Sequence, residues 1–250
     1  EGLANTAAVW HGGRMLVMEE GHRPYEIDPI TLDSIGSWTF RGKLHTAMTA
    51  HPKIDPATGE MVFFAYMATG PFSEDVMVHK VNPEGVLTQS IHIPTPYSAM
   101  VHDFVITEKY IVIPIFPITG SLERAMEGGP PFAWEPSKGV HVGILPRDAD
   151  SADNIRWLEM DNCFVFHFMN AFDSDGVISV DAAQFTQAPL FPTLDGETTG
   201  EVRSRLCRWT IDMNNPEARV DSVPLDDFEL EFPQIDLRLA GQPYQIGRAH

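Results

Sequence analysis

Short apolar runs with a period of two constrain this sequence more than any other feature. They are rich in β-branched and aromatic residues, and Gly, Pro, Asp or Asn bounds each of them, which is typical of buried strands joined by turns. The 250 residues include 19 Gly and 20 Pro, a content that suits short strands better than long helices. We therefore predict an all-β fold with buried strands at residues 15–18, 61–66, 110–116, 140–145 and 163–168.

One segment has the signature of a helix. Ser121 precedes the stretch Leu-Glu-Arg-Ala-Met, and a serine at this place caps a helix by accepting a hydrogen bond from a backbone N–H. We predict helical turns over residues 121–126, within a loop that ends at the Gly-Gly-Pro-Pro of residues 128–131.

A turn motif recurs at a spacing of 27 residues: Ile27-Asp28-Pro29, Ile54-Asp55-Pro56 and Val81-Asn82-Pro83. Asp and Asn accept local backbone hydrogen bonds and Pro presets φ, so each copy predicts a turn between two strands. Asn215-Pro216 is a candidate for a further copy. Repeated strand–turn–strand units predict stacked antiparallel sheets, as in a β-propeller. No change of composition divides the chain, so we predict a single domain over residues 1–250.

The charge balance excludes some classes of partner. The chain carries 35 acidic and 17 basic residues, a formal charge of −18, which repels nucleic acid and an anionic membrane surface. It has no apolar run of about 18 residues, so we predict no transmembrane segment. Cys163 and Cys207 are too few for a disulfide framework, which favours a reducing, cytoplasmic location.

Three of the ten histidines differ from the rest in their surroundings. His51, His102 and His167 lie in apolar stretches at or near predicted strand ends. Six others are expected beside turns or on polar faces: His11, His22, His45, His79, His92 and His141. A buried imidazole is unfavourable unless its nitrogens find partners, and either a metal ion or a hydrogen bond in the core meets that need. The separations of 51 and 65 residues match no compact zinc motif, but they suit ligands from successive sheets that converge on a central axis.

Five motifs, in this order along the chain, resemble the carotenoid cleavage oxygenase family, and within it the bacterial lignostilbene and stilbene dioxygenase branch. They lie at residues 51–60, 102–108, 142–147, 166–173 and 231–236. The resemblance implies a seven-bladed β-propeller with a ferrous ion on its axis. Family members are longer than this chain, so the resemblance also implies an incomplete, central segment of the propeller that lacks N- and C-terminal parts.

The resemblance implies a metal site as well. The family holds iron with four histidines; His51, His102 and His167 match the first three, and the motif of the fourth would lie beyond the given sequence. Family glutamates accept the free N–H of these ligands, and Glu19 and Glu231 resemble two of them. A carboxylate at that place holds the ring in one tautomer and raises its basicity. Without the resemblance, the neighbours of Glu19, which are Glu20 and Gly21, favour a solvated turn residue instead.

The implied activity is that of a non-haem iron oxidoreductase. Such a dioxygenase adds dioxygen across an electron-rich C=C bond of a stilbene-like phenylpropanoid or an apocarotenoid and forms two carbonyl products. Stilbene-cleaving relatives have a lysine where Met18 stands, which favours a more apolar substrate here. Met18, Phe104, Phe116 and Phe168 are candidates for the substrate pocket, with Phe166 beside them, although core packing explains each phenylalanine better than a pocket does.

Other functions stay open. A non-catalytic propeller fragment, or pseudoenzyme, would bind an apolar ligand or a partner through an open sheet edge. A structural zinc site is a further alternative. The sequence contains no Gly-x-Ser-x-Gly, phosphate loop or dinucleotide fingerprint, and Cys163 lies in an apolar run that does not suit a nucleophile. Asp103 and Asp173 read as loop carboxylates without a catalytic role.

Overall fold

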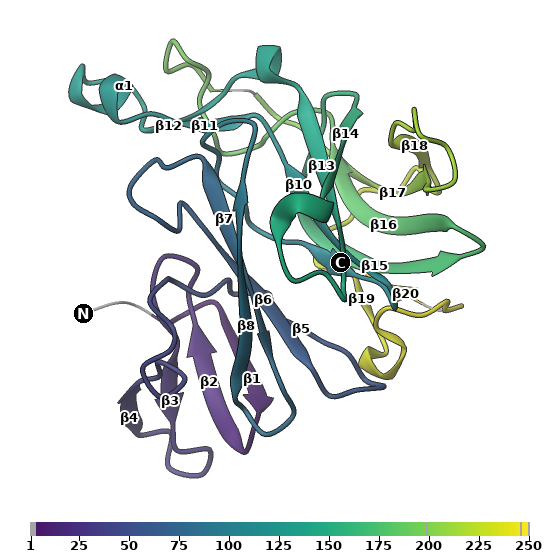
Figure 1. The fold of residues 1–250 in the computed structure, drawn as a ribbon. Helices are drawn as coiled ribbons and strands as arrows, with labels where there is room; N and C mark the ends of the chain where they lie inside the picture. Colours follow the sequence, from purple (N-terminus) through teal and green to yellow (C-terminus); the bar gives the residue numbers. More distant parts are fainter. Residues whose placement is uncertain (1–3, 199, 246, 250) are drawn as a thin grey trace. The chain divides into compact units, whose positions relative to one another are not determined.

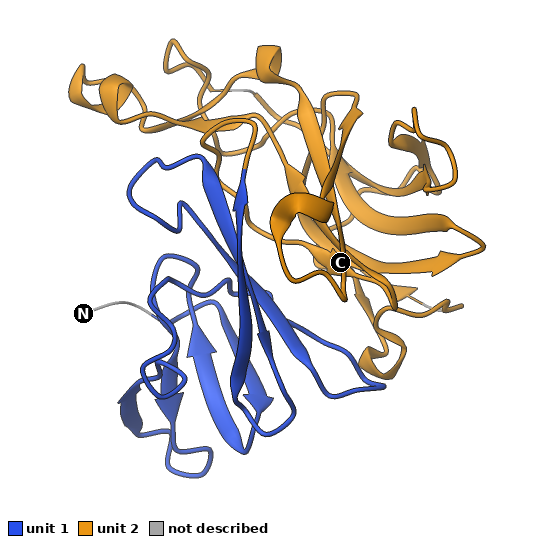
Figure 2. Cartoon of the chain, viewed as in Figure 1, with its two compact units in different colours: residues 1–94 blue, residues 95–250 orange. Residues whose placement is uncertain are grey.

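The computed structural model describes residues 4–198, 200–245 and 247–249, and strands dominate its secondary structure (Figure 1). The chain forms two compact units, residues 1–94 and residues 95–250 (Figure 2), and each is described below by itself. The prediction of an all-β fold is confirmed for the described residues, in which the five-residue α1 (Leu122–Met126) is the only α-helix.

Unit 1 contains two four-stranded antiparallel sheets, each a meander in which strands that follow one another in sequence are also neighbours in the sheet. The strands of the first sheet are β1 (Ala7–His11), β2 (Arg14–Met18), β3 (Tyr25–Ile27) and β4 (Ser34–Ser37). Those of the second sheet are β5 (Lys53–Ile54), β6 (Met61–Tyr66), β7 (Asp75–Val81) and β8 (Leu87–Pro94). Four-stranded meanders of this kind are the blades of β-propellers.

Unit 2 contains two more four-stranded antiparallel sheets. The first is formed by β9 (Val105–Ile106), β10 (Tyr110–Ile115), β13 (Val140–Pro146) and β14 (Arg156–Met160). The second is formed by β15 (Phe164–Ser174), β16 (Val177–Phe185), β17 (Ser204–Asp212) and β18 (Asp221–Pro224). Two small hairpins add β11 (Ile118–Gly120) with β12 (Phe132–Trp134), and β19 (Gln234–Ile235) with β20 (Gly247–Arg248). In the first sheet, β11 and β12 are inserted in the chain between the paired strands β10 and β13. Three short 3-10 helices lie at Pro136–Lys138, Ala152–Asn154 and Leu237–Leu239.

The local predictions are confirmed. Four of the five apolar runs correspond to β2, β6, β10 and β13, and the fifth, at residues 163–168, covers the beginning of β15. The predicted helix is α1, and the Ser121 hydroxyl accepts a hydrogen bond from the Arg124 backbone N–H at 3.1 Å. These features depend on neighbours within a few residues, which is why the sequence pattern suffices to find them.

The turn motif begins a hairpin at each of its three copies. Asp28 follows β3, Asp55 follows β5 and Asn82 follows β7, and each side chain accepts a backbone N–H of its own turn. Two N–H groups, those of Thr31 and Ile30, donate to Asp28 and lower the pKa of its carboxyl.

The 27-residue spacing of the motif is half of the spacing between equivalent turns of the two sheets in unit 1. Asp28 and Asn82 both follow the third strand of their sheets, 54 residues apart, whereas Asp55 follows a first strand. Asn215, the candidate for a further copy, follows the third strand β17 and accepts the Glu217 N–H. Asp55 and Asn82 therefore begin the first and third hairpins of the β5–β8 sheet. Asp28 and Asn215 begin the third hairpins of the β1–β4 and β15–β18 sheets.

Each unit has its own apolar core. In unit 1 the two sheets and the segment between them enclose Leu16, Met18, Phe40, Leu44, Met48, Met61, Phe63, Val81 and Leu87. In unit 2 the fully buried Trp209 packs edge-on against Phe116 and Phe168. These contacts hold the strands on which the chemistry-bearing residues lie.

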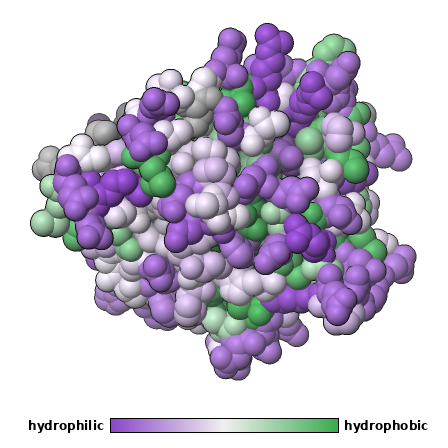
Figure 3. Space-filling model, turned by 90° about the horizontal axis from the view of Figure 1, so that it is seen from above, coloured by the Kyte–Doolittle hydropathy of each residue, from purple (hydrophilic) through white to green (hydrophobic). Residues whose placement is uncertain are grey.

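Hydrophilic side chains cover much of the face drawn in Figure 3, and hydrophobic ones lie among them in small groups. This agrees with the strongly acidic composition. Within the part of the chain that the structure describes, no helix has the length and apolar character needed to cross a membrane.

Candidate metal centre

His102 and His167 face each other in unit 2. His102 lies three residues before β9, and His167 lies within β15, a strand that packs against β9. Both residues are half-buried, and their Nε2 atoms are 3.4 Å apart. The fold thus brings together two imidazoles that are 65 residues apart in the sequence.

Glu231 determines the tautomer of His167. Its Oε2 lies 2.8 Å from Nδ1 of His167 and also accepts the Phe232 backbone N–H at 2.8 Å. An ionised carboxylate only accepts hydrogen bonds, so Nδ1 carries the ring proton. The neutral ring then has its lone pair on Nε2, the atom that faces His102. Such an arrangement is what metal-ligating histidines show.

The pair fits a metal ion. Two nitrogen ligands at about 2.1 Å from one ion, at tetrahedral or octahedral angles, lie about 3.0 to 3.4 Å apart, which matches the Nε2 separation here. The second oxygen of Glu231, Oε1, is buried without a hydrogen-bond partner among the described residues. A buried carboxylate oxygen in that state is costly unless a positive charge lies nearby, and a bound cation supplies one.

A buried carboxylate joins the two histidine segments. Asp103 is 3% exposed, and its Oδ1 accepts the Phe104 N–H at 2.8 Å while its Oδ2 accepts the Phe168 N–H at 3.0 Å. These two N–H groups lie just beyond His102 and His167 in the chain. The sequence shows only an aspartate beside a histidine, and nothing in it indicates the bond to β15.

Two aromatic rings border the histidines. Phe166 meets His102 edge-on at 5.5 Å between centroids, and Phe232 covers His167 at 4.7 Å. Phe232 has a φ of 48°, a left-handed conformation that is unfavourable for a bulky residue. The sequence motif contains Phe232, but its place over the ring was not predicted. The site therefore combines nitrogen ligands with apolar walls.

The predicted pocket residues lie in the cores. Phe104, Phe116 and Phe168 are no more than 5% exposed, and Phe116 and Phe168 pack against Trp209. Met18 is 1% exposed in the core of unit 1. Packing accounts for these contacts, and a role in binding substrate stays a prediction.

The other predicted site residues belong to unit 1. His51 precedes β5, and its backbone N–H donates to the Thr49 hydroxyl. Glu19 follows β2, and its Oε2 lies 2.8 Å from Nδ1 of His22. Burial, and then the nearby Glu20 and Glu19, raise the pKa of Tyr66. His51 has the same topological place as His102 and His167, because each lies beside or within the first strand of its four-stranded sheet.

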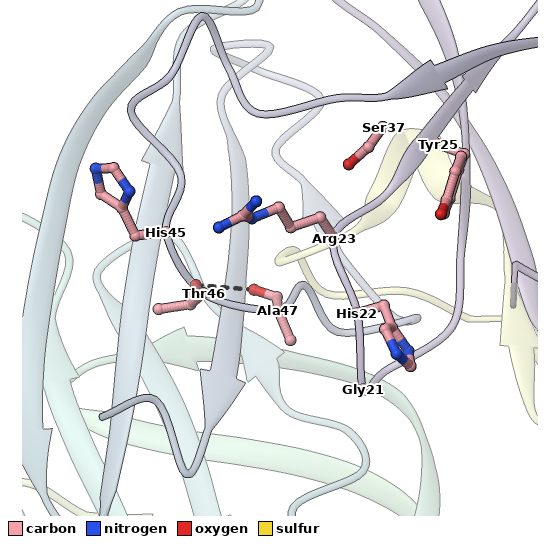
Figure 4. Close-up of a pocket in the computed structure, with 8 residues that line it drawn as sticks. All are labelled: Gly21, His22, Arg23, Tyr25, Ser37, His45, Thr46 and Ala47. Carbon is pink, nitrogen blue, oxygen red and sulfur yellow. Dashed lines mark hydrogen bonds between the residues drawn. The ribbon is translucent and has the colours of Figure 1, made fainter. Parts of the chain in front are cut away.

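Unit 1 also has a hollow of about 360 Å³ (Figure 4). It is lined by Gly21, His22, Arg23, Tyr25, Ser37, His45, Thr46 and Ala47. Figure 4 shows Arg23 extending between the segment with Ser37 and the segment with Thr46, whose hydroxyl donates to the Ala47 carbonyl. Its lining is polar and includes a cation, so it does not suit an apolar alkene.

Comparison with known proteins places these observations in a family context. A family model described as "RPE65: Retinal pigment epithelial membrane protein" matches residues 1–247. Isoeugenol monooxygenase of Pseudomonas putida is 35% identical over 249 residues, covering 97% of this chain and 52% of that protein.

Two solved structures extend the comparison. The lignostilbene dioxygenase of Pseudomonas brassicacearum superposes with a TM-score of 0.92 at 38% identity, over 98% of this chain and 52% of the other. The cobalt-substituted ACO of Synechocystis gives 0.84 at 26% identity, over 100% and 54% of the two chains. This chain therefore spans about half the length of the proteins that it matches.

Proposed function

The chain belongs to the RPE65, or carotenoid cleavage oxygenase, family, and we propose that the protein containing it is an iron-dependent dioxygenase that cleaves a C=C bond into two carbonyl products. Its all-β fold is that of these propeller enzymes, over about half of their length. The family membership agrees with the five motifs of the sequence, and the relatives are named as oxygenases.

We assign the metal to His102 and His167, with His51 as a third ligand. The facing Nε2 atoms of His102 and His167, with Glu231 on the far side of His167, are the observation that carries the proposal. For His51 the support is its family motif and its equivalent place before a first strand. Glu19 is proposed as a second supporting carboxylate on its motif alone, since the described contact of its side chain is to His22.

Iron bound by these residues would supply the one-electron chemistry with dioxygen that side chains lack. The chain's own groups orient and shield the site. Glu231 keeps the His167 proton on Nδ1, and the rings of Phe166 and Phe232 pack against those of His102 and His167. No side-chain acid or base is needed for the cleavage.

The substrate that we propose is a small apolar or phenolic alkene, either a stilbene-like phenylpropanoid or an apocarotenoid. Names of the relatives support both classes, since one is a lignostilbene dioxygenase and another an apocarotenoid oxygenase. Met18, where stilbene-cleaving relatives have lysine, favours a substrate without a phenolate. Met18, Phe104, Phe116 and Phe168 are the pocket residues proposed from the sequence. We also propose a cytoplasmic location, supported by two buried free thiols, of which Cys163 has a pKa raised by burial.

The test uses the protein as its gene encodes it, purified with iron and supplied with a hydroxylated stilbene or an apocarotenal. We expect about one iron per chain, oxygen uptake that depends on substrate, and two aldehyde or ketone products by mass spectrometry. Bound zinc without oxygen uptake would instead support a structural metal site. A protein that binds no metal and cleaves neither alkene would contradict the proposal and leave the non-catalytic binding module.

A further inference from the structure

We propose that Asp103 is the positioning residue of the metal centre, because its carboxylate joins the backbone beside His102 to the backbone beside His167 and so sets the distance between the two imidazoles. The inference rests on the proposed metal site and concerns how the positions of its two histidine ligands are fixed. Asp103 touches neither substrate nor metal in this role and acts only through the two histidines.

The two carboxylate oxygens of Asp103 bind different elements, the segment before β9 and the strand β15. Oδ1 accepts the N–H of Phe104, at the entry to β9, and Oδ2 accepts the N–H of Phe168, in the middle of β15. With each oxygen bound to a different element, the rigid carboxylate fixes the distance between them. The carboxylate is 3% exposed, so water does not compete for these hydrogen bonds.

The irregular pairing of β15 explains why this bond is needed. Val165 pairs with Gln184 and Phe168 with Ala182, so three steps along β15 correspond to two along β16. This bulge contains His167, and bulges re-aim side chains next to functional sites. The Phe168 N–H beside it donates to Asp103. Asp103 therefore also stabilises the distortion that directs His167 toward His102.

Asp173 is a matched control on the same strand. Its side chain is 3% exposed, although the residue as a whole is half-buried. Its Oδ1 accepts the Lys109 N–H at 3.1 Å and its Oδ2 lies 3.4 Å from Nζ of Lys109, and both contacts tie the β9–β10 turn to β15. It joins the same two sheets as Asp103, but it lies six residues beyond His167. If Asp103 acted only as a general tie between the sheets, Asp173 would be its equivalent.

The experiment compares Asp103→Asn with Asp173→Asn in the whole protein, stripped of metal. Cobalt(II) titration followed by its visible absorption bands measures metal affinity and ligand geometry, and thermal unfolding measures stability. An amide offers one acceptor oxygen and so breaks one of the two bonds of Asp103. Outer partners of metal ligands change affinity by about 10- to 100-fold, and we expect a loss in that range with altered cobalt bands. Asp173→Asn should lower the unfolding temperature while its cobalt titration matches the unmodified protein.

Two results would overturn the inference: wild-type affinity and spectrum in Asp103→Asn, or an equal loss of affinity in Asp173→Asn. Should Asp103→Asn not fold, Asp103→Glu takes its place, since it keeps both acceptors on a longer arm. It should bind cobalt more weakly than the unmodified protein, with shifted bands, and an unchanged titration would again contradict the role. An unmodified protein that binds neither cobalt nor iron would refute the proposed function itself.

Discussion

Two histidines of this chain, the buried His79 and the half-buried His167, differ in what their nitrogens meet. In β7 of unit 1, His79 is 3% exposed, stacks on Phe63, and has a hydroxyl at each nitrogen, from Thr46 at 2.9 Å and Ser90 at 2.8 Å. In β15 of unit 2, His167 has a carboxylate at one nitrogen and a second imidazole at the other.

The two hydroxyls beside His79 satisfy both of its ring nitrogens. The Thr46 hydroxyl donates to the Ala47 carbonyl, so it accepts from Nε2 of His79, and the Ser90 hydroxyl donates to Nδ1. At His167 the Glu231 carboxylate accepts a hydrogen bond from Nδ1–H, and Nε2 faces the ring of His102. Burial alone therefore does not identify a ligand. His79 meets two hydroxyls and belongs to the core, whereas His167 has a carboxylate at one nitrogen and a second imidazole at the other, which is the arrangement of a metal ligand.

The largest expected effect is a loss of metal binding, and substitution of His167 and of His79 separates a metal ligand from a core histidine. His167→Ala should weaken metal binding by more than about 100-fold, since loss of a ligand exceeds loss of its outer partner. His79→Ala should keep the metal but lower the free energy of unfolding by about 1–3 kcal/mol, because it removes a buried ring and the hydrogen-bond partner of the Thr46 and Ser90 hydroxyls. Iron content by mass spectrometry and urea unfolding measure both. Metal loss in His79→Ala with retention in His167→Ala would reverse the comparison.

The second effect concerns acid stability. Burial lowers the pKa of His79 from 6.5 to about 4. Between these values the unfolded chain binds a proton that the folded chain does not, so stability falls as the pH falls from 6.5 to 4 and is unaffected above 6.5. The shift corresponds to roughly 3 kcal/mol at its full extent. His79→Gln should remove this loss, so its unfolding free energy should approach that of the unmodified protein as the pH drops. Parallel curves from pH 7 to pH 4.5 would show that His79 does not titrate this way.

The third effect tests the carboxylate behind His167. Glu231→Gln keeps a hydrogen-bond acceptor but removes the charge, and we expect about 10- to 100-fold weaker metal binding. Glu229→Gln is the control, since Glu229 is exposed and pairs only loosely with Arg203 at 3.5 Å. Equal affinities of the two variants in a cobalt titration would argue against the assigned role of Glu231.

The smallest effect concerns the ring over His167. Phe232→Ala removes an aromatic contact worth about 0.5–1.5 kcal/mol, which corresponds to at most about a tenfold change in metal affinity. Phe228→Ala, at another exposed phenylalanine, is the control. If both variants bind metal as the unmodified protein does, the contact of Phe232 with His167 does not stabilise the site.

The sequence alone determined the elements and the chemistry available to them. The strand at residues 61–66, the helix capped by Ser121 and the turn at Asp28 depend on alternation or hydrogen bonds within a few residues, and such interactions can be read from neighbours in the chain. The apolar settings of His102 and His167 were visible for the same reason, and the family resemblance selected them from ten histidines.

Only the tertiary structure decided which residues meet. The facing of His102 and His167, the Asp103 bond to β15 and the placing of Phe232 over His167 join residues that are 65 positions apart. Such contacts depend on strand register and on the bulge in β15, and one residue of slip would turn His167 to the other face of its sheet. Local pattern does not encode that register, because it results from packing the whole sheet against its neighbours.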